Sequence, residues 1–66
     1  MEVLANGKPV RVDDGATVAE LLAHLGLAGR VVVVERNGEP IVRTEAGQVT
    51  LRDGDRLEIV RAVAGG

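Results

Sequence analysis

Few side chains in this sequence are suited to chemistry. It contains neither serine nor cysteine, and its one histidine is His24. A serine or cysteine nucleophile is therefore excluded, and no thiolate is present to bind a metal or form a disulfide. Carboxylates are paired at Asp13/Asp14 and at Asp53/Asp55. Both pairs lie in turn-like sequence, where aspartate hydrogen-bonds to its own backbone, so we interpret them as turn residues.

The remaining candidate for chemistry is the stretch Ala64-Gly65-Gly66. Glycine is costly to hold in a regular element, so we expect residues 64–66 to form a flexible tail. A segment without side chains can thread a narrow channel in another protein and carry the α-carboxylate of Gly66 to a reactive centre. A merely frayed terminus is the alternative, and the glycine pair alone does not decide between them.

The composition indicates one small domain over residues 1–66, with no metal or cofactor of its own. Hydrophobic residues make up 45% of the chain, none of them aromatic, and the net charge is −2. That charge argues against a protein that binds phosphate backbones, and the lack of aromatic residues removes any platform for stacking bases. The start of the sequence lacks the pattern of a signal peptide, and no apolar run is as long as a membrane span. We therefore expect a soluble cytoplasmic domain.

The first third of the sequence predicts a β-hairpin and then a helix. Strand-like segments at 1–6 and 9–13 flank Asn-Gly, the pair that favours a type I′ hairpin turn. Apolar residues at helical spacing follow, and Thr17 with Glu20 forms the T-x-x-E capping box. Gly26 is suited to end the helix in the left-handed conformation. We predict a helix over 17–25, with His24 near its C-terminus complementing the helix dipole.

The rest of the sequence predicts strands separated by turns. The expected elements are a strand at 31–36, a turn at 37–38, a short strand near 41–42, an extended piece at 49–51, a turn at 53–55 and a last strand at 56–63. Four successive valines, residues 31–34, indicate a strand that is buried on both faces or one whose outer face meets a partner.

This order of elements predicts an α+β domain with the β-grasp (ubiquitin-like) fold. In that fold a mixed sheet of four to five strands carries one main helix on one face, and the last strand lies at its centre. One helix over one sheet is the smallest way to enclose a core. The predicted core residues are Val3, Val12, Leu21, Leu25 and Ile59.

The last strand has two different faces. Leu57 and Ile59 alternate with Glu58, Val60 and Ala62. If the helix covers Leu57 and Ile59, the other three side chains face outward beside the tail. Such exposure is common and carries no meaning by itself, but an apolar patch at this position would also suit a partner. Glu58, Val60 and Ala62 are therefore candidate docking residues.

Over its whole length the chain resembles the ubiquitin-like sulfur carrier proteins, and most closely the ThiS family of bacterial thiamine biosynthesis. The resemblance is carried by "NGK", "GATVAELLAHLGL", "VVVERNGE" and, most specifically, "DGDRLEIVRAVAGG". The family often places a proline after the Ile-Val that follows the Asn-Gly turn, whereas here Pro40 precedes Ile41. It also often carries a bulky residue on the partner face, where this chain has Val60 and Ala62.

The resemblance implies a carrier and not an enzyme. An E1-like adenylyltransferase, using ATP and magnesium, would adenylate the carboxylate of Gly66. A persulfide from a cysteine desulfurase or another donor would then convert it to a thiocarboxylate, and thiazole synthase would accept the sulfur. In this scheme the chain itself binds no cofactor, nucleic acid or membrane.

Two other functions stay open. The acceptor of the sulfur could instead be molybdopterin, a tRNA thiolation enzyme or cysteine synthesis, because the tail would be the same. The chain could also be a β-grasp binding module similar to the TGS regulatory domains, which have no reason to end on Gly-Gly. An enzyme with its own active site is disfavoured by the missing serine, cysteine and second histidine.

Overall fold

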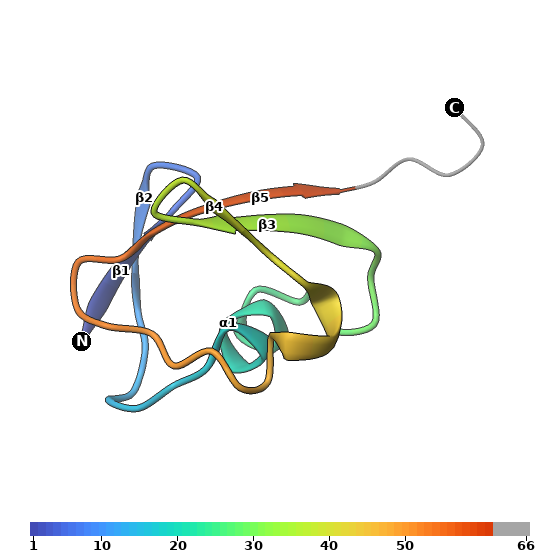
Figure 1. Ribbon diagram of the computed structural model, residues 1–66. Coiled ribbons are helices and arrows are strands. Elements are labelled where there is room, and N and C mark those ends of the chain that lie inside the picture. The colour runs from blue at the N-terminus through green and yellow to red at the C-terminus, as the bar shows by residue number, and fades with distance from the viewer. Residues whose placement is uncertain (62–66) are drawn as a thin grey trace.

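The computed structural model describes residues 1–61, and residues 62–66 lie outside the described part. One helix packs beneath one face of a five-stranded sheet (Figure 1). The strands are β1 (Glu2–Ala5), β2 (Lys8–Arg11), β3 (Val32–Arg36), β4 (Glu39–Ile41) and β5 (Arg56–Arg61). Their order across the sheet is β2-β1-β5-β3-β4. Strand β5 pairs with β1 in parallel and with β3 antiparallel, and the other neighbours are antiparallel. The predicted β-grasp fold, with the last strand at the centre, is confirmed.

Both Asn-Gly pairs form the predicted tight turns. Asn6 and Asn37 each have a φ of 52°, and the glycines that follow have φ of 80° and 86°. Two successive residues with positive φ are the signature of a type I′ turn, whose twist matches that of the flanking strands. The hairpins β1–β2 and β3–β4 therefore follow from the same two-residue signal.

The helix α1 (Val18–His24) is one residue shorter at each end than the predicted 17–25, because Thr17 and Leu25 are its N-cap and C-cap. The hydroxyl of Thr17 accepts from the amide of Glu20 at 3.2 Å, and the carboxylate of Glu20 accepts from the amide of Thr17 at 3.1 Å. These two bonds satisfy amide groups that the first helical turn leaves free. At the other end Gly26 has a φ of 77° and closes the helix.

The segment between β4 and β5 differs from the prediction. Val42 is not part of a strand but precedes a short 3-10 helix, η1 (Arg43–Glu45), which no sequence signal indicated. The piece at 49–51 forms only an isolated bridge, between Thr17 and Thr50. It is extended because the amide of Val18 donates to the carbonyl of Val49, and the amide of Leu51 donates to the carbonyl of Ala16. The backbone at the start of α1 thus makes the hydrogen bonds that a neighbouring strand would otherwise make.

The core lies between α1 and the inner face of the sheet. Its buried residues are Val3, Ala5, Val18, Leu21, Val34, Ala46, Leu51, Leu57 and Ile59. Val12 and Leu25, which we expected among them, are only partly buried against this cluster. Val12 follows the last residue of β2 and Leu25 is the C-cap of α1, so neither is enclosed on all sides. Within residues 1–61, no helix is long and apolar enough to cross a membrane.

Candidate functional site

Strand β5 presents its two faces to different surroundings. Leu57 and Ile59 are 1% and 7% exposed and pack beneath the sheet, whereas Val60 is 61% exposed. Glu58 is exposed as well. The predicted division of this strand into a core face and an outer face is confirmed for these four residues.

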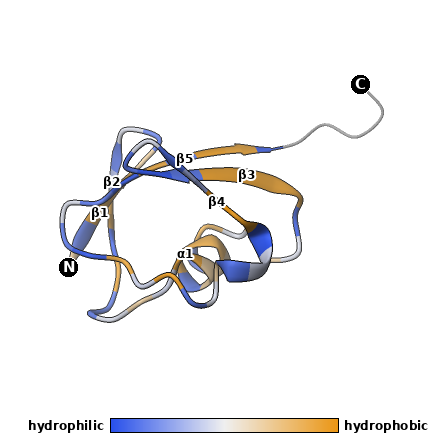
Figure 2. Cartoon of the chain, in the orientation of Figure 1, coloured by the Kyte–Doolittle hydropathy of each residue, from blue (hydrophilic) through white to orange (hydrophobic). Residues whose placement is uncertain are grey.

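The four valines that precede and begin β3 are not buried on both faces. Val34 is 5% exposed, but Val31 and Val33 are 58% and 55% exposed, so this alternative is wrong. Val33 lies directly opposite Val60 in the antiparallel register of β3 and β5. We call Val33 and Val60 the outer valine pair. In Figure 2 the parts of β3 and β5 that contain these valines are hydrophobic, whereas β5 ends on the hydrophilic residue Arg61.

Two glutamates lie beside the outer valine pair. Glu35 and Glu58 lie directly opposite each other in the same register, and each is two residues from the outer valine of its own strand. Both glutamates are exposed. Within residues 1–61, neither takes part in an ion pair. Like charges that face each other across two strands destabilise a sheet. We call Glu35 and Glu58 the outer glutamate pair.

Four of the predicted site residues fall outside the described residues. They are Ala62, Ala64, Gly65 and Gly66. Their placement beside the outer valine pair, and the role of Gly66, therefore stay predictions. What the structure does place is Arg61, the residue that precedes them, which pairs with Val32 at the end of β5.

Two asparagine side chains bind the main chain of β5. Asn6 accepts from the amide of Ile59 at 2.7 Å and donates to the carbonyl of the same residue at 3.0 Å. Asn37 accepts from the amide of Arg56 at 2.9 Å. The main-chain amide of each asparagine also donates to a carbonyl of β5. Asn6 donates to Leu57 and Asn37 to Arg56, both at 2.8 Å. The residues that form the two turns therefore also hold the central strand.

Asp55 joins the start of β5 to the β3–β4 turn. It is 6% exposed, and its carboxylate accepts from the amide of Arg52 at 2.8 Å, from Nε of Arg36 at 2.8 Å and from Nδ2 of Asn37 at 3.1 Å. Burial raises the pKa of Asp55, but these three hydrogen bonds and the charge of Arg36 outweigh it, so the pKa lies below the ordinary 3.8. Asp55 is an ionised structural anchor and not only a turn residue.

The other three aspartates lie in or beside turns, as predicted, but their carboxylates do not bind the nearby backbone: Asp13 acts through its main-chain carbonyl, and Asp53 binds a residue 51 positions away. The carbonyl of Asp13 accepts from the amide of Ala16, and Asp53 accepts from the amide of Glu2 at 2.9 Å. Asp14 lies 3.3 Å from the amino group of Met1. Among the described residues, no three His, Cys, Asp or Glu side chains are grouped as a metal site requires.

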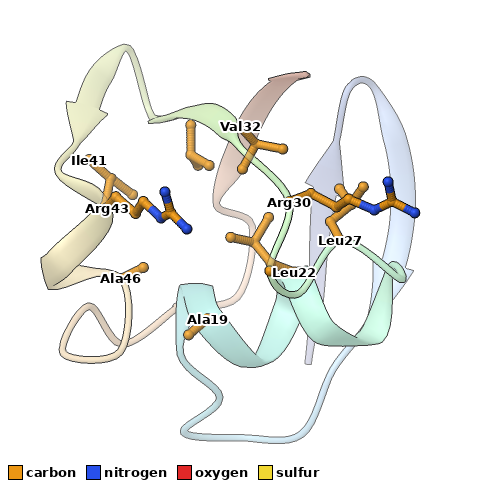
Figure 3. Close-up of a pocket in the computed structure, with 10 residues that line it drawn as sticks. Ala19, Leu22, Leu27, Arg30, Val32, Ile41, Arg43 and Ala46 are labelled. Atoms are coloured by element: carbon orange, nitrogen blue, oxygen red, sulfur yellow. The ribbon is translucent and has the colours of Figure 1, made fainter. Parts of the chain in front are cut away.

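A small apolar cleft opens between α1 and the β3–β4 hairpin (Figure 3). Its volume is about 150 Å³, and Leu22, Val32 and Ile41 are among the aliphatic residues that line it. Arg43 extends toward the cleft from η1, and Arg30 lies at its opposite end. The lining contains no carboxylate, hydroxyl or imidazole group. The cleft offers a surface for contact but no group for acid–base or nucleophilic chemistry.

Sequence reasoning missed three features of this site. The Asn-Gly signal predicted both turns, but it said nothing of side chains that reach β5. Asp55 was one of two aspartates in a turn, with no sign that it would be the buried one. The outer glutamate pair depends on the register between β3 and β5, and β4 and η1 lie between these strands in the sequence.

Comparisons with known proteins agree with the β-grasp fold described above. The model of the ThiS family matches residues 2–66. The sulfur carrier protein ThiS of Bacillus subtilis is 44% identical over 62 residues, which are 92% of this chain and 94% of that protein. The crystal structure of a thiamine biosynthesis protein (ThiS) from Geobacter metallireducens superimposes with a TM-score of 0.83 at 39% identity, and the match covers all of both chains.

Some relatives are much longer. A thiazole synthase of Paramagnetospirillum magneticum is 41% identical over all 66 residues of this chain. The chain spans about a fifth of the length of this relative and of a second thiazole synthase, from Magnetococcus marinus. Since the family model covers nearly every residue and the carrier of B. subtilis matches at almost full length, the chain belongs to the ThiS family.

Proposed function

We propose that this chain is a sulfur carrier of thiamine biosynthesis that carries sulfur on the α-carboxylate of Gly66. The observation that carries the proposal is that the family match runs through Gly65 and Gly66, a few residues after the end of the central strand β5. The names of the B. subtilis and G. metallireducens relatives support the same role. The reactive group is then the end of the main chain, which accounts for the few reactive side chains.

The chemistry needs activation because a carboxylate is a poor electrophile. In the proposed sequence the carboxylate oxygen of Gly66 attacks the α-phosphate of ATP and pyrophosphate leaves, which gives an acyl-adenylate. The terminal sulfur of a persulfide then attacks the carbonyl carbon and AMP leaves. A thiol cleaves the sulfur–sulfur bond of the resulting acyl disulfide and is itself oxidised to a disulfide, which releases the thiocarboxylate. The carrier contributes the substrate carboxylate, and its partners contribute the catalytic groups.

The proposed partners follow from these steps. An E1-like adenylyltransferase binds ATP and magnesium and activates Gly66, and a cysteine desulfurase or another persulfide donor supplies the sulfur. Thiazole synthase takes the sulfur from the carrier. Two relatives that contain a region similar to the whole of this chain are themselves named thiazole synthase, which supports a close association of the two activities. In this role the chain is a protein substrate and not an enzyme, and it acts in the cytoplasm.

We place the docking surface on the outer face of β3 and β5. The outer valine pair is exposed and continuous across two strands, and β5 leads directly to the predicted docking residue Ala62. The outer glutamate pair adjoins it and includes the predicted docking residue Glu58. An apolar patch beside two exposed carboxylates suits a partner surface that combines aliphatic side chains with an arginine or lysine.

Two alternatives keep the same fold. A carrier that serves molybdopterin synthesis or tRNA thiolation would use the same tail with another acceptor, and a binding module similar to the TGS domains would not need the tail. The acceptor can be identified by supplying thiocarboxylated protein to thiazole synthase and to the competing acceptors in parallel. The family match favours thiamine biosynthesis.

The role of Gly66 can be tested by changing only the end of the chain. One variant lacks Gly66 and a second has an alanine added after it. Both should abolish ATP–pyrophosphate exchange by the activating enzyme, because the carboxylate is then misplaced by one residue. All nine core residues lie between Val3 and Ile59, so the melting temperature should stay that of wild type. Normal activity of the extended variant would favour the binding module.

A further inference from the structure

The pairing between β1 and β5 is continued by a side chain. The main chain of β1 pairs with β5 only at Leu4↔Arg56 and Ala5↔Leu57, because the first hairpin turns away at Asn6. At Ile59 the side-chain carboxamide of Asn6 pairs with β5 in place of the main chain of β1. It accepts from the amide of Ile59 at 2.7 Å and donates to the carbonyl of Ile59 at 3.0 Å. A carboxamide offers the same donor and acceptor as a peptide group. It therefore replaces the next pair of hydrogen bonds in the parallel ladder.

This contact lies near the point where β5 ends. Ile59 is two residues before Arg61, the last described residue of the strand. On the opposite side of β5, strand β3 pairs with Val60 and Arg61. The final part of β5 is thus held by a strand on one side and by the Asn6 side chain on the other. Without Asn6, the amide and carbonyl of Ile59 would have no partner on the side of β1.

We infer that Asn6 is a positioning residue for the reaction at Gly66. By fixing the main chain at Ile59, it sets the direction in which residues 60 and 61, the last two of β5, lead toward the tail. The inference rests on the proposed function, since it concerns how the tail is presented to the active site of a partner. Reactions in such sites are sensitive to placement, and a displacement of about 1 Å can lower a rate by about 100-fold.

The second turn supplies a matched control. Asn37 has the same φ of 52° as Asn6, is also followed by glycine, and also binds the main chain of β5 with its side chain and its amide. Its contact is at Arg56, at the start of β5 and far along the strand from the tail. Glycine adopts positive φ without strain, so Asn6→Gly and Asn37→Gly keep each turn and remove only the carboxamide.

The experiment compares wild type, Asn6→Gly and Asn37→Gly as full-length chains. Their melting temperatures are measured, and kcat and KM are determined for ATP–pyrophosphate exchange with the E1-like enzyme, at a temperature where all three are folded. We expect both variants to melt earlier. Only Asn6→Gly should lose kcat, by about 10-fold to 100-fold, with KM unchanged because the outer valine pair is intact. Equal kcat for the two variants would overturn the inference, because their effects would then reflect stability alone.

Hydrogen exchange gives a readout that needs no partner. In Asn6→Gly the amides of Ile59 and of Val60, which pairs with Val33, should exchange faster than in Asn37→Gly, and unchanged exchange at both would contradict the inference. If Asn6→Gly does not fold, Asn6→Asp decides, since it keeps the acceptor for the amide and loses the donor, and it should lose part of kcat. Failure of wild type in pyrophosphate exchange would count against the proposed function, while the exchange of the Ile59 and Val60 amides would still test the role of Asn6.

Discussion

The two faces of β3 and β5 have the same kind of side chain and opposite surroundings. On the inner face Val34 lies opposite Ile59, and these residues are 5% and 7% exposed. On the outer face Val33 lies opposite Val60, and these are 55% and 61% exposed. Each residue is the chain neighbour of one on the other face. The inner pair is accounted for by folding, whereas the outer pair contributes little to the core and is where we propose that a partner docks.

The contrast between the two faces is tested most strongly by substituting two neighbouring residues of β5, one on each face. Ile59→Ala should lower the free energy of unfolding by about 2–5 kcal/mol, because it removes buried methylene groups and leaves a cavity. Val60→Ala should change it by less than about 0.5 kcal/mol, since the side chain is largely exposed. Urea denaturation followed by circular dichroism measures both. Equal losses would show that the outer face is also part of the core.

A substitution of Asp55 tests whether the stability of the fold depends on a buried charge as well as on buried apolar side chains. Asp55→Asn should lower the free energy of unfolding by about 1.5–3 kcal/mol, because three donors lose a charged acceptor. In the folded protein the pKa of Asp55 is depressed below 3.8, so its contribution is present above that pH. The contribution is lost as the pH falls through the folded pKa.

Denaturation curves of wild type and Asp55→Asn between pH 7 and pH 2 check this sign. The difference in stability between them should be constant near neutral pH and shrink below about pH 4 as the wild-type carboxylate is protonated. A difference that stays constant down to pH 2 would contradict the ionised anchor.

The outer face should respond in the opposite way, with little effect on folding and a large effect on binding. Val60→Glu places a third carboxylate beside the outer glutamate pair. The affinity for the E1-like enzyme should fall by at least about tenfold, equivalent to about 1.4 kcal/mol, while the melting temperature changes little. Isothermal titration calorimetry measures the affinity, and Glu39→Gln serves as a surface control on β4. Unchanged affinity in Val60→Glu would remove the proposed docking surface.

The smallest expected effect is a gain in stability. Glu35→Gln removes one of two like charges that face each other, so the free energy of unfolding should rise by about 0.2–1 kcal/mol at low salt. The gain should shrink in high salt, which screens exposed charges. Affinity for the activating enzyme should fall in the same variant if a basic side chain of the partner meets this pair. A variant that is more stable and binds equally well would show that the glutamates play no part in docking.

The sequence predicted what depends on neighbours along the chain. Thr17 with Glu20 marked the start of the helix, and the two Asn-Gly pairs marked both hairpins. It failed where distant segments decide. Val12 is only partly buried because β2 ends before it, and Asn6 reaches a residue 53 positions away. Local patterns carry no information on which distant main-chain group a side chain will meet.

The candidate site follows the same division. The outward direction of Glu58 and Val60 followed from the alternation of side chains along a strand. Their neighbours Val33 and Glu35 could not be named, because the register between β3 and β5 is fixed by the whole sheet. The role of Gly66 came from the resemblance to the family and not from any geometry.

The central claim is that Gly66 carries the sulfur, and intact mass spectrometry with fragmentation of the C-terminal peptide tests it most directly. The protein is incubated with its E1-like enzyme, ATP and a persulfide donor. We predict that one oxygen is replaced by sulfur, and that fragmentation places the sulfur on Gly66. Fragmentation is required because oxidation of Met1 adds nearly the same mass at the opposite end. An unmodified Gly66, with an enzyme shown to activate another carrier, would contradict the account.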